Sequence, residues 1–363
     1  MTRPLLLQGD VREVLKTFDE ESIQCVVTSP PYWGLRDYGN PLSLWGGDPD
    51  CVHSFDEENK ANTREHGKGR WNHTYGERIN KGKKQGRKQV EWQVVQDPDN
   101  MPSTVKVSQG RYCKKCGSWE GCLGLETTPE QFVNNMVEVF QEVKRVLRKD
   151  GTVWLNLGDS FMNKNLVGIP WRVALALQAD GWYLRSNIIW HKPNPMPESC
   201  KDRPTKSHEH IFLLTKSPKY YYDVDAIRES VSEISLKRAE YGWDCDRPST
   251  KNASMGGEGI HTEKMGSRFV NPKGRNKRDV WEITTKPYKD ARFATFPKEL
   301  PETCIKAGTK KGDMVLDIFA GSGTTLRVAS KLGRNSIGIE INEEYLEIAR
   351  KRCKIDSESL LDF

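Results

Sequence analysis

The sequence has no long hydrophobic run. Across its 363 residues no apolar stretch approaches the roughly 18 residues that a membrane-spanning helix requires. A secretion signal is missing too, because the apolar residues 5–7 are too few and are followed at once by Gly9 and Asp10. These absences exclude an integral membrane protein and predict a soluble, cytoplasmic one.

Hydrophobic residues are few, and the cysteines are odd in number. The hydrophobic fraction is 36% and the charged fraction 29%, so we expect solvated loops beside one α/β domain of substantial size. The formal net charge of +6 indicates a nucleic-acid partner only if the basic residues cluster. Nine cysteines argue against a disulfide framework and in favour of reduced thiols or metal ligands.

The most informative segment lies near the C-terminus. Residues 313–325 read Asp-Met-Val-Leu-Asp-Ile-Phe-Ala-Gly-Ser-Gly-Thr-Thr, a short apolar strand that ends at two glycines, and a helical pattern follows. A second strand, residues 335–340, ends in Glu340, where the acid of an α/β sheet hydrogen-bonds a ribose. Because glycines allow close backbone approach and a helix N-terminus offers free N–H groups, this pattern predicts a site for a nucleoside-containing ligand.

A dinucleotide is the simplest such ligand, but one glycine is missing. The third glycine of the Gly-x-Gly-x-x-Gly fingerprint would fall at Leu326. The turn instead resembles the S-adenosylmethionine loop of class I methyltransferases. That resemblance implies that Asp317 lies near the methionine moiety and that Glu340 holds the ribose hydroxyls. It implies further cofactor contacts at Phe319, Ala320, Gly321, Gly323, Thr324 and Thr325.

Only two strand–helix units fit between residue 313 and the C-terminus. Two units cannot enclose a cofactor or bury both faces of a parallel sheet. The missing strands must come from earlier in the chain, so the sequence predicts a circularly permuted, Rossmann-like α/β fold with its cofactor-binding half last.

The N-terminal region supplies strands for this sheet. We expect strands at residues 5–10 and 22–27, separated by a short helix at residues 11–18. The second strand runs into the turn Thr28-Ser29-Pro30-Pro31-Tyr32-Trp33. Its two prolines fix the backbone and lack N–H groups, which leaves carbonyls pointing outward as hydrogen-bond acceptors.

This turn has the parts that alkylation of an exocyclic base amine requires. The nitrogen lone pair is delocalised into the ring, so acceptors must draw on both N–H bonds while the flipped base lies flat against an aromatic face. The Ser29 hydroxyl, the Pro30 carbonyl and the Tyr32 ring supply these parts, on a turn that Pro31 stiffens. The alternative is a rigid strand-end turn with its aromatic rings packed inward.

In combination, the two motifs resemble a known family. Thr-Ser-Pro-Pro-Tyr-Trp, followed much later by Asp-Ile-Phe-Ala-Gly-Ser-Gly-Thr-Thr, is similar to the permuted (β-group) amino-methyltransferases of DNA. These bacterial and phage enzymes methylate N4 of cytosine or N6 of adenine with S-adenosylmethionine. The resemblance covers most of the chain and implies that Asp10 contacts the cofactor adenine. Serine at position 29 is similar to the cytosine-N4 members, whereas adenine enzymes usually carry Asp or Asn there.

The resemblance also divides the chain. Residues 1–33 and 123–225 would form the catalytic half of the core, and residues 291–363 the cofactor-binding half. Residues 34–122 would be a basic insertion and residues 226–290 the target recognition region. Family members line the methionine end of the cofactor with a phenylalanine–proline segment, which corresponds here to Phe293, Thr295 and Phe296.

The insertion carries a candidate zinc site. Cys51 and His53 stand at its beginning, and Cys113-Lys-Lys-Cys116-Gly stands at its end. A Cys-x-x-Cys followed by glycine is a knuckle that holds tetrahedral zinc, and Cys51 with His53 would complete the ligands. Cys122 is a competing ligand. The alternatives are unrelated free thiols, or a redox pair, which no thioredoxin-like strand supports.

Two segments concentrate the basic charge. Residues 60–90 hold ten Lys or Arg against two acids, with Trp71, His73 and Tyr75 interleaved, and residues 264–278 hold six basic residues and no acid. We expect the first segment to follow DNA phosphates and the second to belong to the target recognition region. Solvated or disordered loops are the alternative.

The remaining core elements follow from periodicity. A helix begins after Thr128 and is expected to end at Asp150-Gly151. Further elements are a helix at residues 171–179 and strands at residues 152–157, 184–190 and 208–215. Asp159 follows a strand and is a secondary site candidate. The proline-rich residues 191–198 would shape the pocket wall or turn a corner.

The sequence thus predicts a site-specific methyltransferase that acts on cytosine N4 in double-stranded DNA by base flipping, with adenine N6 as the second choice. A competing class is a nucleic-acid-binding protein without activity, and RNA is a weaker alternative substrate. A cognate restriction endonuclease is a further candidate partner. The sequence does not distinguish a monomer from a homodimer.

Overall fold

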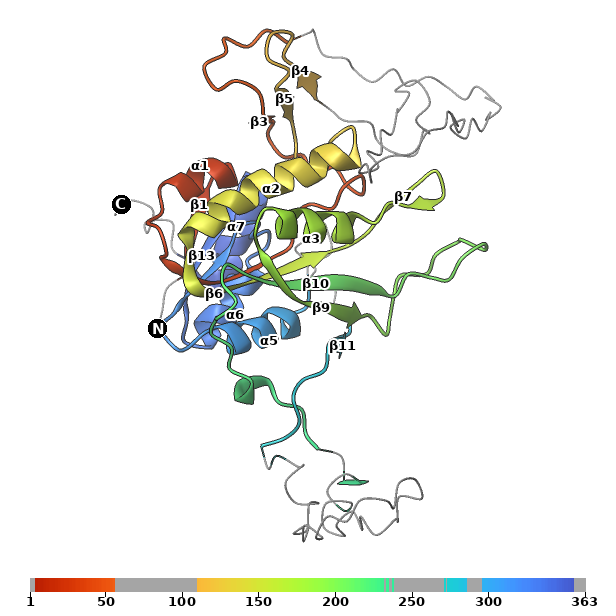
Figure 1. The fold of residues 1–363 in the computed structure, drawn as a ribbon, viewed down its shortest axis with the longest axis vertical. Coiled ribbons are helices and arrows are strands. Elements are labelled where there is room, and N and C mark those ends of the chain that lie inside the picture. Colours follow the sequence, from red (N-terminus) through yellow and green to blue (C-terminus); the bar gives the residue numbers. More distant parts are fainter. Residues whose placement is uncertain are drawn as a thin grey trace, which may run out of the picture.

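The computed structural model describes residues 4–55, 110–231, 271, 273–285 and 296–355, together with residues 233, 234 and 237 (Figure 1). The basic segment at residues 60–90 and the predicted cofactor residues Phe293 and Thr295 lie outside the described residues, as does most of the predicted recognition region.

One eight-stranded sheet forms the centre of the molecule. Its order is β1-β13-β12-β2-β6-β10-β9-β11. The strands are β1 (Leu5–Gln8), β2 (Ile23–Thr28), β6 (Leu147–Leu157), β9 (Tyr183–His191), β10 (His208–Thr215), β11 (Val280–Glu282), β12 (Met314–Asp317) and β13 (Asn335–Glu340). Neighbours from β1 to β6 are parallel, β10 is antiparallel to β6 and to β9, and β11 is parallel to β9.

Strands from the two ends of the chain lie side by side in this sheet. β13 pairs with β1, and β12 pairs with β2. The expectation that the C-terminal units take their missing strands from earlier in the chain is therefore confirmed.

Helices cover both faces of the sheet. Helices α1 (Val11–Lys16), α2 (Pro129–Val146) and α3 (Ile169–Ala179) lie on one face, and α5 (Glu299–Gly308) and α6 (Thr324–Lys331) lie on the other (Figure 1). Helix α7 (Glu343–Cys353) packs beside α6 and against β1 and β13. Side chains of β2 alternate between the two cores: Val26 joins the α1–α3 side, whereas Cys25 and Val27 join the α5–α6 side.

Helix α2 follows the predicted pattern but ends early. Thr128 caps it by accepting a hydrogen bond from the Gln131 backbone N–H, and its buried stripe includes Phe132, Met136, Val139, Phe140 and Val143. The predicted end at Asp150-Gly151 is wrong. Leu147 already adopts an extended backbone and pairs with Ile23 of β2, so β6 begins there and includes Asp150 and Gly151.

Smaller elements project from this core. Strands β3 (Ser43–Trp45), β5 (Trp119–Gly121) and β4 (Arg111–Tyr112) form a three-stranded sheet that lies beyond α2 in Figure 1. Strands β7 (Phe161–Met162) and β8 (Asn165–Leu166) form a hairpin, and η2 (Asp225–Ile227) is a short 3₁₀ helix. No helix within the described ranges is long and apolar enough to span a bilayer.

The α2 core predicts a mutational cost. Phe140 has no exposed surface, so Phe140→Ala should lower the free energy of unfolding by about 3–5 kcal/mol through lost burial and a residual cavity. Urea unfolding followed by circular dichroism measures this loss. Asn134→Ala, on the exposed face of the same helix, should change stability by less than about 0.5 kcal/mol, and equal losses in the two variants would contradict the packing argument.

Candidate active site

A cavity of about 950 Å³ opens where the parallel strands end. Its lining includes residues that directly follow five strands: Gly9 after β1, Ser29 after β2, Gly158 after β6, Ile318 after β12 and Ile341 after β13. The carboxyl edge of an open α/β sheet is where ligands bind, because the loops there diverge and leave a crevice.

The predicted catalytic turn forms part of the cavity wall. Ser29, Pro30, Pro31 and Tyr32 all line the cavity. The Tyr32 ring packs against Gly158 so closely that a Cβ on Gly158 would lie 2.4 Å from Tyr32 Cε2. The Ser29 hydroxyl donates to Tyr32 Oη at 3.3 Å. The turn thus holds a hydroxyl and an aromatic ring at one end of the cavity.

A hydrogen-bonded network that the sequence analysis missed fixes Tyr32. The Tyr32 hydroxyl donates to Glu209 Oε2 at 2.7 Å, and Asn156 Nδ2 donates to Tyr32 Oη at 2.7 Å and to Glu209 Oε2 at 3.0 Å. Lys192 forms an ion pair with the other oxygen of Glu209. Asn156 Oδ1 is buried and has no hydrogen-bond partner within the described part of the chain. An acid inside the apolar strand at residues 208–215 was the available signal.

Charges in this network are held in one state. Burial opposes ionisation of Glu209, but the charge of Lys192 and the hydrogen bonds from Lys192, Tyr32 and Asn156 outweigh it, so the pKa of Glu209 lies below its ordinary value. Burial, reinforced by the Glu209 charge, raises the pKa of Tyr32 well above its ordinary value. At neutral pH the network therefore contains a carboxylate and a neutral phenol.

Glu340 also lines the cavity, at the end of β13, two strands away from β2, together with part of the glycine turn. Its carboxylate accepts from the Gly321 N–H at 2.7 Å and from the Asn342 N–H at 2.9 Å, and burial raises its pKa. Among the other predicted cofactor residues, those that line the cavity are Asp10, Phe296, Phe319, Ala320, Gly321 and Thr324.

Three predicted cofactor residues in or beside the glycine turn do not line the cavity: Asp317, Gly323 and Thr325. Asp317 is buried, and its carboxylate accepts from the hydroxyls of Thr28 at 2.8 Å and Thr325 at 2.7 Å. Burial raises the pKa of Asp317 to about 6. Gly323 has a φ of 73°, and a Cβ there would lie 2.9 Å from Cys353 Sγ, so this glycine allows α6 and α7 to pack closely.

Asp10 is fixed by neighbouring groups. It caps α1 and pairs with Arg12, whose Nη2 lies 2.8 Å from Asp10 Oδ2. Burial opposes ionisation of Asp10, but the hydrogen bonds and charge of Arg12 outweigh it, so the pKa of Asp10 lies below its ordinary value. Asp10 therefore presents a carboxylate to the cavity at neutral pH.

Two other sequence candidates line the cavity. Asp159 accepts from the N–H groups of Ser160, Gly168 and Ile169, and so satisfies free N–H groups at the start of α3. The proline-rich segment contributes Asn194, Pro195, Met196 and Glu198 to the wall, which decides in favour of its pocket-wall interpretation.

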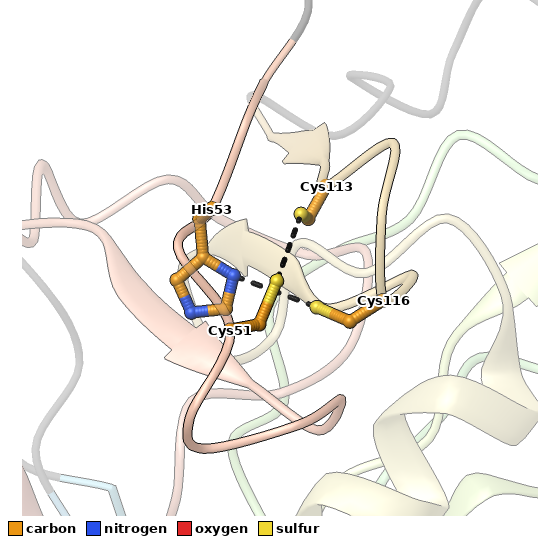
Figure 2. A group of neighbouring side chains, drawn as sticks. All are labelled: Cys51, His53, Cys113 and Cys116. Atoms are coloured by element: carbon orange, nitrogen blue, oxygen red, sulfur yellow. Dashed lines mark hydrogen bonds between the residues drawn. The ribbon is translucent and has the colours of Figure 1, made fainter.

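The four predicted metal ligands come together outside the cavity (Figure 2). Donor atoms of Cys51, His53, Cys113 and Cys116 all lie within 4.8 Å of one another. The Cys51 and Cys113 sulfurs are 3.9 Å apart, and Cys116 Sγ lies 3.5 Å from His53 Nδ1. Cys122 is not part of the cluster, since its thiol donates to the Asn40 carbonyl at 3.1 Å. The arrangement can hold one tetrahedral ion.

The fold is an open α/β sheet with a cavity at its carboxyl edge, lined by a hydroxyl-bearing turn and part of a glycine turn. The profile of a family described as DNA methylase, the N6/N4 methyltransferases, matches residues 23–351. The chain belongs to this family and is an S-adenosylmethionine-dependent DNA methyltransferase.

Named relatives agree with this assignment. The type II methyltransferase M.Cfr9I of Citrobacter freundii is 36% identical, over 96% of this chain and 87% of that enzyme. The type II methyltransferase M.SmaI of Serratia marcescens is 32% identical, over 96% of this chain and 89% of that enzyme.

Solved structures share the fold. The PvuII DNA methyltransferase, described as cytosine-N4-specific, superposes with a TM-score of 0.57 at 17% identity, over 99% of this chain and 88% of that one. A Thermus thermophilus protein described as a DNA modification methylase was solved with S-adenosyl-L-methionine. It superposes with a TM-score of 0.50 at 21% identity, over 97% of this chain and 93% of that one.

The buried ion pair predicts a pH-dependent stability loss. Lys192→Met leaves the Glu209 charge without its partner, so the free energy of unfolding near neutral pH should fall by about 3 kcal/mol. Because the folded-state pKa of Glu209 lies below its unfolded value of 4.5, the stability it contributes is present above that pH and is lost as pH falls through the lower folded pKa. The difference from wild type should therefore shrink below pH 4.5.

Urea unfolding near neutral pH and well below the unfolded pKa of Glu209 measures this difference. Lys201→Met, an exposed lysine on the same loop, is the matched control and should be nearly neutral. A loss in Lys192→Met that is the same at both pH values would contradict the role assigned to the Glu209 charge.

Proposed function

We propose that the enzyme methylates the exocyclic N4 of cytosine in double-stranded DNA, after the target base flips into the cavity. The observation that carries this proposal is the Ser29 hydroxyl, which lines the cavity beside the Tyr32 ring at the position where adenine enzymes usually carry an acid or amide. The cytosine-N4 specificity in the description of the PvuII enzyme agrees with it.

The proposed mechanism depends on positioning. S-adenosylmethionine supplies a methyl group that is already activated as a sulfonium. Ser29 Oγ and the Pro30 carbonyl accept the two amine N–H bonds, which directs the nitrogen lone pair out of conjugation, and the Tyr32 ring holds the base flat. The nitrogen would then bond to this methyl in line as the methyl–sulfur bond breaks, which leaves the neutral thioether S-adenosylhomocysteine, and the amine would lose one proton to water. Orientation supplies most of the rate, because serine is a poor base.

The cofactor would occupy the other end of the cavity. Glu340 would accept hydrogen bonds from the ribose hydroxyls, Asp10 would contact the adenine amine, and the backbone at Phe319–Gly321 would approach the methionine portion. Phe296 lines the cavity and would extend this wall, with Phe293 and Thr295 proposed beside it from the resemblance. Asp317, Gly323 and Thr325 would act through the shape of the turn.

We also propose that the fold is circularly permuted, with the catalytic half at residues 1–33 and 123–225 and the cofactor half at residues 291–363. Support comes from the sheet, in which β12 and β13, the C-terminal strands, lie between β1 and β2. Residues 34–122 would be the insertion and residues 226–290 the recognition region. The type II names of the relatives favour a role in restriction–modification, with a cognate endonuclease as partner.

We propose further that Cys51, His53, Cys113 and Cys116 bind a structural zinc ion. With zinc–sulfur bonds of about 2.3 Å, two thiolates of a tetrahedral site lie roughly 3.8 Å apart. The 3.9 Å between Cys51 and Cys113 fits this geometry. The Ser54 N–H also donates to Cys113 Sγ at 3.4 Å, which favours the thiolate form that binds metal.

The catalytic proposal predicts the identity of the product. After incubation with unmethylated DNA and S-adenosylmethionine, mass spectrometry of the nucleosides should find N4-methylcytosine. Tyr32→Ala should reduce kcat/KM by about 10–100-fold, since stacking of one base is worth about 1–3 kcal/mol. The matched control is Tyr183→Ala, which changes a tyrosine at the first residue of β9, outside the cavity lining. Detection of N6-methyladenine would instead identify the second candidate function, and no methylated base would refute the mechanism.

The zinc proposal predicts the metal content. Purified protein should contain about one zinc per chain by plasma mass spectrometry, and Cys51→Ser or Cys113→Ser should abolish it. The Cys200→Ser variant, which changes a cysteine outside the cluster, should retain zinc. Equal zinc content in all four proteins would refute these ligands.

A further inference from the structure

The segment that leads to the metal cluster also forms one wall of the cavity. Between the catalytic turn and Cys51, the residues that line the cavity are Leu35, Arg36, Tyr38, Asn40, Pro41, Ser43 and Trp45. We call residues 38–45 the insertion wall. It reaches both carboxylates that the proposed function assigns to the cofactor, Asp10 and Glu340, through separate contacts.

The first contact joins the insertion wall to Asp10. Arg12, which pairs with Asp10, donates from Nη2 to the Leu44 carbonyl at 2.8 Å, and its guanidinium lies 3.7 Å from the centre of the Trp45 ring. The Ser43 side chain also hydrogen-bonds Asp10. The orientation of the Asp10 carboxylate therefore depends on where residues 43–45 lie.

The second contact joins the insertion wall to Glu340. Asn342 donates its backbone N–H to Glu340 Oε1 at 2.9 Å and its side-chain N–H groups to the Tyr38 carbonyl and to Asn40 Oδ1, both at 3.2 Å. One asparagine thus joins the proposed ribose-binding acid to the insertion wall. Displacement of residues 38–40 would remove two of these three bonds.

The other side of the insertion wall is fastened to the metal cluster. Trp45 pairs with Trp119 across β3 and β5, and its Nε1 donates to the Gly121 carbonyl at 3.1 Å. At Gly47 the chain approaches the knuckle so closely that a Cβ would lie 3.0 Å from Cys116 Sγ. The strands of this sheet have only two or three residues each, which is too short for independent stability.

We infer that the insertion wall is a cofactor-binding element whose geometry depends on the bound metal, so that zinc and S-adenosylmethionine bind cooperatively. This inference depends on the proposed function for the assignment of Asp10 and Glu340. Without metal, the short strands lose the link between their ends. The contacts of the insertion wall with Arg12 and with Asn342 then weaken. Since coupling between the binding free energies of two ligands is reciprocal, the cofactor must also raise the affinity for zinc by the same factor.

The test measures cofactor binding directly, without DNA or turnover. Isothermal titration of the full chain with S-adenosylmethionine compares zinc-loaded, chelator-stripped and zinc-reloaded protein. Stripping should weaken the affinity by about tenfold or more, a coupling within the usual range, and reloading should restore it. In equilibrium competition with a chromogenic chelator, S-adenosylmethionine should raise the affinity of the protein for zinc by the same factor.

Two variants distinguish the contribution of the insertion wall to cofactor binding from the contribution of the metal. Cys51→Ser should lose zinc and weaken cofactor binding, whereas the control Cys200→Ser should change neither. Asn40→Ala removes one bond to Asn342, so it should weaken cofactor binding while zinc content stays unchanged. This variant keeps the test decisive if stripped protein or Cys51→Ser fails to fold, as judged by circular dichroism.

Several results would overturn the inference. If stripped, folded protein binds the cofactor as tightly as loaded protein, the metal serves the insertion alone. If Asn40→Ala binds the cofactor normally, the insertion wall has no part in cofactor binding. If wild-type protein holds no zinc yet binds the cofactor and methylates DNA, this inference and the zinc proposal fail while the proposed methyl transfer stands.

Discussion

The buried carboxylate of Asp317 joins the two parts of the chain on which the active site depends. Its oxygens accept hydrogen bonds from Thr28, at the end of β2, and from Thr325, in the first turn of α6. Thr28 directly precedes Ser29, and Thr325 is the second residue after the glycine turn, which ends at Gly323. The turn that begins at Ser29 and the glycine turn that ends at Gly323 are therefore held next to each other by one side chain, although almost 300 residues separate them in sequence. Burial disfavours ionisation of this carboxyl, and the hydroxyl donors offset part of that cost.

The elements predicted from the sequence were those set by local pattern. The strands at residues 208–215 and 335–340 have the predicted bounds, because each is an apolar run between clear turn signals. The proximity of Cys113 and Cys116 also followed from spacing, since a knuckle is a local motif, and Cys51 and His53 join them in the structure as predicted. The end of α2 did not, because Leu147 leaves the helix to pair with Ile23, a contact more than 120 residues away in sequence. The Glu209 network was missed for the same reason: it forms only when β6, β9 and β10 align.

The missing third glycine of the dinucleotide fingerprint shows how tertiary structure replaces a sequence signal. In that fingerprint a helical glycine lets the helix pack closely on the strand. Here the helix carries Leu326, and the small residue is on the strand instead: a Cβ on Gly338 would lie 2.9 Å from both Leu326 and Ala320. Close approach of α6 and β13 is thus achieved from the opposite side. A motif search on the helix alone does not reveal this exchange.

The electrostatics of the site favour positioning over acid–base chemistry. The ionisable groups nearest Ser29 are held away from titration at neutral pH, Glu209 as a carboxylate paired with Lys192 and Tyr32 as a neutral phenol. A group that does not change its charge near neutral pH is a poor proton shuttle, but it holds its hydrogen bonds in one arrangement. Glu209 fixes the Tyr32 hydroxyl, and Gly158 leaves room for the Tyr32 ring. Under the proposed mechanism, the buried ion pair therefore serves the reaction by keeping the stacking surface for the base in place.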